Sequence, residues 1–362
     1  MRLPPSMAIV AALAACSQRN EPAVIGYAFE ISGAPSVAVA RDEIAAWPVR
    51  RPDIRLVFDS VASGEPADVE VERALRLVAV PGIVGVVGHA GSRGSLAGAP
   101  VYNEAGVVHV VPTSTSRLLQ GAGRWTFPLA PDDSVEGAFI AEFVTTSLGA
   151  RRVSIFFAND EYGQGLRAGV RAHLASVGAT ILDEVPFAAS SEVDLLVDAS
   201  LKRGAPEVVV SAGRWGETGT LARLMRARVP GVRVVAGDGA MYLPNLADAA
   251  GPAVDALYVV DFWVLNPADS LHVAFVDRFR RVTGRLPLGP QAMSHDAILL
   301  LAHAVREVGS HPDAVRRYLA SLGGERPPYA GVTGPIAFGP GRRANLVMTR
   351  LVNGRPERVA LP

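Results

Sequence analysis

The sequence predicts an α/β protein of two Rossmann-like lobes with parallel sheets, joined by a hinge of several strands. Short apolar runs rich in Val and Ile alternate with stretches of helical periodicity, as in doubly wound α/β folds. The apolar runs are nearly continuous, which suits strands buried on both faces of a parallel sheet. The alternation occurs twice in tandem along 362 residues, a length that suits two domains.

Each lobe is predicted from one set of alternating elements. In the first set we expect strands at 24–29, 54–59, 83–87 and 107–111, and helices at 36–47, 68–78 and 92–103. In the second set we expect strands at 153–158, 180–185, 208–212 and 232–236, and helices at 166–177, 193–203 and 218–228. The lobe boundaries follow from these sets.

The carboxy-terminal third has a different pattern. Helices are expected at 270–283, 291–308 and 312–322 without strands between them, and β character returns at 334–338 and 345–352. We therefore assign 23–130 to lobe 1, 131–260 to lobe 2, 261–330 to a return into lobe 1, and 331–362 to a hinge return with the last strands. Breaks at 125–133 and 261–269 separate these parts. Repeated crossing between lobes makes a hinge that permits closure around a ligand.

The amino terminus predicts export. Arg2 precedes a short apolar stretch at 6–15, which ends in Leu13-Ala14-Ala15-Cys16. A positive start, a short apolar segment and small residues at its end are typical of a secretory signal, and the segment is too short to span a bilayer. Leu-Ala-Ala-Cys resembles the lipobox of bacterial lipoproteins, which implies a signal at 1–15, a lipidated Cys16 and a tether at 16–22. The alternative is an ordinary cleaved signal with an incidental cysteine; either way the mature chain works outside the cytoplasm.

The composition excludes several other classes. Charged residues make up 19% of the chain and the formal net charge is zero, which argues against nucleic-acid binding. The single cysteine cannot form a disulfide within the chain. After the signal, no run of 18 uncharged apolar residues predicts a transmembrane helix.

Hydroxyl side chains follow two neighbouring strands of the first set. Ser92 comes after strand 83–87, at the start of the next helix, and the loop with Thr113 and Thr115 comes after strand 107–111. Ligands in open α/β sheets bind outside the carboxyl ends of the strands, and a helix start attracts anions. These residues could hold a carboxylate. The alternative is that Ser92 and Thr115 only cap helices.

The second set offers groups that suit a cation. Tyr162, the pair Arg214-Trp215 and Asp238 follow its strands, and Asp238 lies between two glycines on an expected open turn. The carboxylate could meet an ammonium group, and the aromatic rings could supply walls and cation–π contact. The alternative for Asp238 is an ordinary turn aspartate.

Motifs along the whole chain resemble one family, the type I periplasmic binding proteins, and more closely the branched-chain amino-acid binding proteins of ABC transporters. The motifs are Gly88-His89-x-x-Ser92, Tyr102-Asn103-Glu104-x-Gly106, Pro112-x-x-Thr115, Asp160-x-Tyr162-Gly163-Gln164-Gly165, Ser294-His295-Asp296-Ala297 and Thr333-Gly334-Pro335-Ile336-x-Phe338. The match runs from about 24 to 352.

The resemblance implies a binding site and a function. It implies that Ser92, Thr113 and Thr115 bind a ligand carboxylate, that Tyr162 lines the cleft, and that Asp238 binds the ammonium. It further implies a monomeric solute-binding lipoprotein of the periplasm or cell envelope that captures an amino acid, or a related amide or carboxylate, and delivers it to an ABC permease.

Three departures from the family pattern bear on the ligand. The first helical stretch, 31–47, is abbreviated, Arg214-Trp215 stands in place of a tyrosine pair, and Asp238 is shorter than the usual glutamate. Because Arg214 would lie in the cleft, a polar or acidic ligand group or an amide becomes plausible in place of a purely aliphatic one.

An enzyme is the rival class, and the sequence argues against it. The turn after the first strand lacks a Gly-x-Gly-x-x-Gly pattern, and neither a Walker pattern nor a Gly-x-Ser-x-Gly elbow occurs. The seven histidines lack metal-binding spacing, so we expect no catalytic residue, metal or cofactor. A further alternative is a lipoprotein sensor or regulator that uses the same fold to contact a protein.

Overall fold

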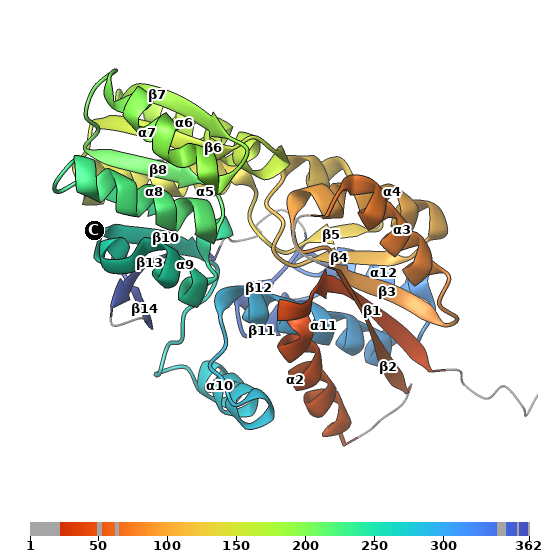
Figure 1. Ribbon diagram of the computed structural model, residues 1–362. Helices are drawn as coiled ribbons and strands as arrows, with labels where there is room; N and C mark the ends of the chain where they lie inside the picture. The colour runs from red at the N-terminus through yellow and green to blue at the C-terminus, as the bar shows by residue number, and fades with distance from the viewer. Residues whose placement is uncertain (1–21, 49–52, 62–64, 339–344, 353–354, 361–362) are drawn as a thin grey trace, which may run out of the picture.

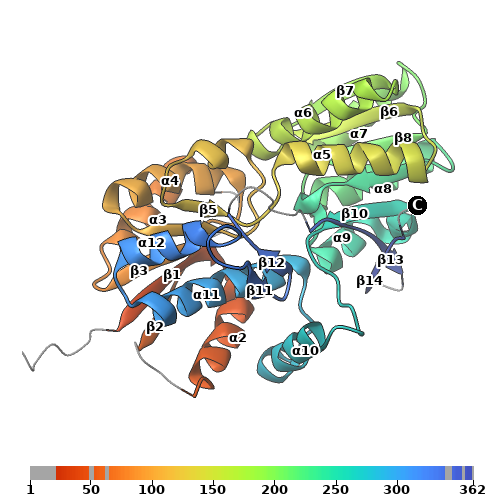
Figure 2. The ribbon, with the colours of Figure 1, turned by 180° about the vertical axis from the view of Figure 1, so that it is seen from behind.

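The computed structural model of the chain describes residues 22–48, 53–61, 65–338, 345–352 and 355–360. Cys16 and the predicted signal lie outside these residues. The strands of the described residues form a five-stranded sheet, a seven-stranded sheet and a two-stranded ribbon. Figures 1 and 2 show the two large sheets in separate halves of the molecule, each layered with helices. This α/β architecture confirms the predicted fold class.

The five-stranded sheet is parallel throughout, in the order β2-β1-β3-β4-β5. Its strands are β1 (Ala23–Glu30), β2 (Ile54–Val61), β3 (Ile83–Gly88), β4 (Val108–Val111) and β5 (Thr126–Pro128). Helices α3 (Ala67–Val78) and α4 (Ser92–Ala105) contact this sheet, as do α2 (Ala34–Ala45), α11 (Gly289–Val308) and α12 (Pro312–Ser321). Figure 1 shows α3 and α4 on the side of the sheet away from α2 and α11.

The seven-stranded sheet has the order β14-β13-β10-β9-β8-β6-β7. Its strands are β6 (Arg152–Ala158), β7 (Thr180–Phe187), β8 (Val208–Ala212), β9 (Arg233–Ala236), β10 (Leu257–Asp261), β13 (Val347–Val352) and β14 (Arg355–Arg358). Strands β6 to β10 run parallel, while β13 and β14 join the edge antiparallel. Helices α5 (Asp133–Glu142), α6 (Glu161–Ser176), α7 (Val193–Leu201), α8 (Trp215–Arg228) and α9 (Leu243–Ala250) accompany this sheet.

Apolar burial on both faces of each sheet holds the layers together. In the first half, α11 contributes Leu300 and Leu301, both fully buried against β1 and α12 residues, while Leu77 of α3 packs on the other face. In the second half, Leu166 of α6 and Leu221 of α8 belong to two different clusters of buried residues. Burying one such side chain contributes about 1.5–3 kcal/mol, so these layers carry much of the stability.

The chain passes between the halves more than once. It leaves the first sheet after Pro128, returns after Asp261 through α10 (Ser270–Thr283), which packs on α2, and leaves again between β12 (Gly334–Ile336) and β13. The short ribbon of β11 (Tyr329–Gly331) and β12 contacts α11 on the way. These crossings fall at or near the predicted breaks; the lobe boundaries and the hinge motion stay predictions.

Several elements differ from the sequence prediction. Helix α6 begins at Glu161, five residues before the predicted start at 166, because the Asp160 carboxylate caps it by accepting from Gly163 N at 3.0 Å. Strand β5, with Pro128, was not predicted within the proline-rich break, nor was β10, which ends where the second break begins. Helices α5 and α9 were also not predicted, and the last strands run antiparallel to the parallel sheet that we expected.

Candidate functional site

A cleft of about 370 Å³ lies between residues of the two halves. It is lined from the first half at the carboxyl ends of β3 and β4, and from the second half at those of β6, β8 and β9. All the predicted ligand-binding residues line this one cleft: Ser92, Thr113, Thr115, Tyr162, Arg214, Trp215 and Asp238. Residues up to 146 positions apart in the sequence therefore meet here because parallel strands end at the same edge of each sheet.

The first wall consists of hydroxyl groups. The Ser114 hydroxyl donates to Ser92 Oγ at 3.3 Å, which leaves the Ser92 proton free to donate to a ligand. Thr113 donates to Ala90 O at 2.9 Å, so its oxygen can still accept. The Thr115 hydroxyl is 1% exposed and has no hydrogen-bond partner in the described part of the chain. The hydroxyl groups of Ser92 and Thr115 are therefore the free neutral donors of this wall, which suits an anion.

The alternative role of Ser92 as only a helix cap is wrong. Gly91 is the N-cap of α4, and no side chain accepts a hydrogen bond from the first backbone N–H groups. The backbone of Gly91 is extended, so the helix begins with the next residue, Ser92. The Ser92 hydroxyl is consequently not occupied by its own helix, and the free N–H groups of the first turn remain available.

The second wall is built around Asp238. The residue lies in a 3₁₀ turn, Asp238–Ala240, and is 6% exposed, so the predicted open turn is wrong. Its backbone N–H donates to Glu136 Oε1 at 2.8 Å, and Gly239 N donates to Tyr162 Oη at 2.9 Å. A Cβ built at Gly237 would lie 2.7 Å from Tyr162 Oη and 3.0 Å from Glu136 Oε1. The two glycines therefore allow neighbouring side chains to approach the backbone closely, and they do not mark an exposed turn.

Two buried acids beside Asp238 were not predicted from the sequence. Asp133 and Glu136 stand one turn apart at the start of α5, 1% and 0% exposed. One oxygen of each carboxyl, and Asp238 Oδ1, lack hydrogen-bond partners among the described residues. A carboxyl pair at spacing i, i+3 in the first turn of a helix was the available signal, but α5 itself was not predicted.

Burial controls the protonation of this cluster. It raises the pKa of Asp238 to about 6 and that of Asp133 to about 8, with the neighbouring negative charge adding to the shift of Asp133. The pKa of Glu136 is raised well above its ordinary value, first by burial and then by the charge of Asp238. Among Asp133, Glu136 and Asp238, Asp238 therefore ionises first and is the carboxylate that can meet a cation. The described residues contain no group of three acid, His or Cys side chains fit to hold a metal ion.

Arg214 and Trp215 form the rim of the cleft. Arg214 Nη2 donates to Asp160 Oδ2 at 2.7 Å, and the guanidinium carbon lies 5.8 Å from the centre of the Tyr162 ring. Trp215 is 39% exposed at the start of α8. Asp160 neutralises Arg214. The rim of the cleft therefore carries a paired cation and an aromatic face, and Arg214 is not a free positive charge.

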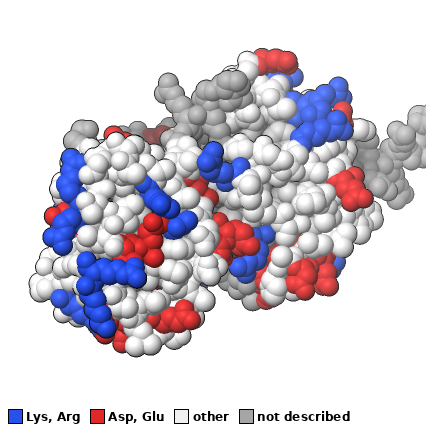
Figure 3. Space-filling view, turned by 90° about the horizontal axis from the view of Figure 1, so that it is seen from above, with Lys and Arg blue, Asp and Glu red and all other residues white. Residues whose placement is uncertain are grey.

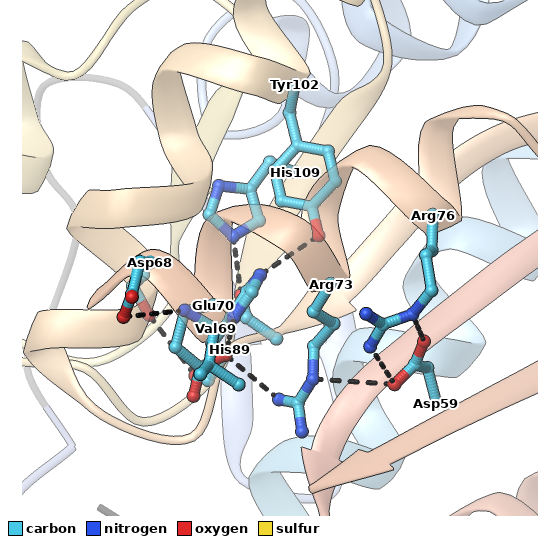
Figure 4. A network of polar contacts seen from close by, with 11 residues as sticks. Asp59, Asp68, Val69, Glu70, Arg73, Arg76, His89, Tyr102 and His109 are labelled. Atoms are coloured by element: carbon cyan, nitrogen blue, oxygen red, sulfur yellow. Dashed lines mark hydrogen bonds and ion pairs between the residues drawn. The ribbon is translucent and has the colours of Figure 1, made fainter. Parts of the chain in front are cut away.

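A polar network on α3 also reaches the cleft and was not predicted (Figure 4). Glu70 and Arg73 both line the cleft and are 8% and 1% exposed. His89 Nδ1 lies 2.6 Å from Glu70 Oε2, and His89 Nε2 lies 2.9 Å from Tyr102 Oη. Burial lowers the pKa of His89, so the neutral ring donates from Nδ1 to Glu70 and accepts from Tyr102. The histidine of the Gly-His-x-x-Ser motif thus orients Glu70 and does not face a ligand itself.

Residues 28–351 match the family of periplasmic binding proteins. The chain belongs to the periplasmic binding protein family. The predicted resemblance is confirmed.

Relatives in the family carry names that concern amino acids. The "Amino acid binding protein" of Pseudomonas aeruginosa is 30% identical over 281 residues, covering 76% of this chain and 73% of its own. The "Leu/Ile/Val-binding protein homolog 1" of Brucella suis is 25% identical over 263 residues, 72% of this chain and 69% of its own. The branched-chain amino acid transporter substrate binding protein of Streptococcus pneumoniae, solved with isoleucine, has a TM-score of 0.82 at 22% identity, covering 94% and 99% of the two chains.

Two further features concern membrane spans and surface charge. No helix of the described residues is long and apolar enough to cross a membrane. Basic and acidic side chains are interspersed on the face shown in Figure 3, as expected for a formal net charge of zero.

Proposed function

We propose that this chain is an extracytoplasmic binding protein that captures an α-amino acid in the interlobe cleft and delivers it to an ABC transporter. In this proposal Ser92 and Thr115 hold the ligand carboxylate, and Thr113 joins them by turning its hydroxyl from Ala90 O to the ligand. Asp238 holds the ammonium, with Tyr162 as its aromatic neighbour. The protein carries out no catalysis on the ligand.

The opposite polarity of the two cleft walls supports this proposal most strongly. One wall offers hydroxyl donors at a helix start, and the other offers a buried carboxylate with an unpartnered oxygen. A zwitterionic amino acid brings one negative and one positive group at a fixed separation. A cleft of about 370 Å³ is of the size that small-molecule sites have. The names of two relatives, the amino acid binding protein and the Leu/Ile/Val-binding protein homolog 1, support the same ligand class.

Calorimetric titration of the mature protein with the standard α-amino acids tests the proposal. We expect at least one amino acid to bind. Asp238→Asn should then cost about 2–5 kcal/mol of affinity, because a desolvated ammonium loses its partner. This corresponds to about 30-fold or more. Asp248→Asn, an exposed acid outside the cleft, is the matched control. Unchanged affinity in Asp238→Asn would refute the ammonium assignment, and absence of binding by any amino acid would refute the function.

Lipid anchoring through Cys16 belongs to the same proposal. Two acyl chains on one cysteine suffice for stable membrane attachment, whereas a single chain gives only reversible binding. Cys16→Ser should move the protein from the membrane fraction to the soluble extracytoplasmic fraction or leave it unprocessed. A membrane-bound variant with the mature mass of the wild type would contradict the anchor.

A further inference from the structure

Arg73 brings a buried, incompletely bonded guanidinium to the cleft. Its Nη1 donates to Glu70 Oε2 at 3.1 Å and its Nε lies 3.6 Å from Asp59 Oδ1. Its Nη2 has no hydrogen-bond partner in the part of the chain that the structure describes, although the side chain is 1% exposed. The Nε contact is an ion-pair distance and not a hydrogen bond, so only Nη1 is hydrogen-bonded. Figure 4 shows Nη1 and Nε on dashed lines to Glu70 and Asp59, and the third nitrogen without such a line. A buried donor without a partner is costly, and a ligand acceptor would remove that cost.

The Arg73–Glu70 pair lies beside the first turn of α4. A Cβ built at Gly94 would lie 3.0 Å from Glu70 Cδ, so the carboxyl group packs against the turn that begins with Ser92. His89 fixes the other side of this carboxyl group. A ligand whose carboxylate rests on Ser92 therefore has Glu70 and Arg73 within its surroundings in the same cleft.

The charges of the cleft decide which acceptor fits. Each arginine that lines it is already paired with an acid: Arg73 with Glu70, Arg93 with Glu161 at 3.1 Å, and Arg214 with Asp160. Glu30 and Glu65 also line the cleft. A second ligand carboxylate would therefore find no uncompensated cation and would face several glutamates. An aliphatic side chain would leave Arg73 Nη2 unpaired.

We infer that the ligand side chain ends in a carboxamide, and that Arg73 Nη2 donates to its carbonyl oxygen. The carboxamide N–H₂ can in turn donate to a glutamate oxygen of the cleft, such as that of Glu70. The group supplies an acceptor and a donor without adding net charge. This inference rests on the proposed function, since Ser92 and Asp238 hold the common part of the amino acid and Arg73 selects the side chain.

Titration with three side chains of similar length separates the alternatives. Wild-type protein is titrated with glutamine, glutamate and methionine, which end in a carboxamide, a carboxylate and an apolar group; asparagine is added to vary the length. We expect glutamine or asparagine to bind at least about tenfold more tightly than glutamate and methionine, since a hydrogen bond to a charged donor is at stake. Arg73→Gln should remove this preference while methionine affinity changes little.

Arg76→Gln is the matched control. Arg76 lies on the same helix and donates to Asp59 at 3.1 and 3.2 Å, but it does not line the cleft. The preference should persist in Arg76→Gln. Equal loss in both variants would mean that the charge network, not contact with the ligand, sets the preference, and would overturn the inference.

The wild-type titrations decide the matter even if Arg73→Gln fails to fold. Tighter binding of methionine or glutamate than of both amides overturns the carboxamide assignment and leaves the proposed function intact. Absence of binding by every amino acid overturns the proposed function and this inference with it. Arg73→Lys, which keeps the charge and shifts the donor, should fold and weaken the amide preference.

Discussion

The buried acids behind the cleft determine how the ligand-free protein responds to pH. Burial raises the pKa of Asp238 to about 6, that of Asp261 to about 7 and that of Asp133 to about 8. An acid with a raised pKa in the folded state binds its proton more tightly when folded than when unfolded. These groups therefore favour the folded state at low pH, and that contribution is lost as pH rises from about 4 to about 8.

Asp133→Asn tests this argument. The isosteric amide cannot ionise, so the variant should melt at a higher temperature than the wild type at pH 8.5 and should show a smaller fall in melting temperature between pH 5 and 8.5. Asp248→Asn, at an exposed position, should follow the wild-type curve. Thermal denaturation monitored by circular dichroism across this range gives the comparison. A wild-type melting temperature that rises with pH over the interval, with no difference for Asp133→Asn, would contradict the assignment.

At the scale of residues, the sequence predicted the strand-end positions of the cleft and not the helix positions. Ser92, Thr113, Thr115 and Asp238 follow strands, and the ends of parallel strands meet by topology alone. Arg73 reaches the cleft from α3, and Glu136 reaches Asp238 from α5, and on a helix the direction of a side chain depends on how that helix packs. Charged residues on amphipathic helices are normally predicted to be solvent-exposed. Nothing in the sequence pattern distinguishes the few charged residues that are buried.

At the scale of elements, the crossing of α5 and α6 sets the position of the acids. A Cβ built at Gly137 would overlap the backbone of Gly169 and Val170, so the two helices touch through glycines. Gly137→Ala should force the helices apart and destabilise the protein by about 1–3 kcal/mol. It should also weaken ligand binding, because α5 carries Asp133 and Glu136.

Gly216→Ala is the matched control for this substitution. Gly216 lies in the first turn of α8, where a Cβ would meet only Ser190 Oγ at an ordinary 3.7 Å. That variant should keep or slightly raise the stability, because alanine favours the helix. Chemical denaturation of both variants measures the difference. Wild-type stability in Gly137→Ala would show that the crossing can relax.

The elements predicted well and poorly differ in length and periodicity. Helix α10 was predicted at its observed bounds, since its apolar residues repeat at helical spacing and glycine ends it at Gly284. Strand β5 has three residues and includes a proline, too few for any period to be visible. The pairing of β13 antiparallel to β10 depends on residues about 90 positions apart, which no local pattern specifies.

At the scale of the whole molecule, movement of the two halves relative to each other would open and close the cleft. An ion pair between Arg93 of α4 and Glu161 of α6 spans the halves at 3.1 Å, and both side chains are more than 40% exposed. Such an exposed pair contributes only about 0–1 kcal/mol, so it cannot hold the cleft closed by itself. A ligand that contacts both walls adds binding free energy to the closed form alone and shifts the population toward it.

Small-angle scattering with and without a bound amino acid tests this closure. The radius of gyration should fall when saturating ligand is added to the wild type. Asp238→Asn at the same ligand concentration should keep the radius of the ligand-free protein, because the second wall has lost its contact. If titration shows full occupancy and the radius stays constant, the segments after Pro128 and Asp261 do not act as a hinge. The ligand would then enter a cleft of fixed width, and selectivity would rest on the side chains of its walls alone.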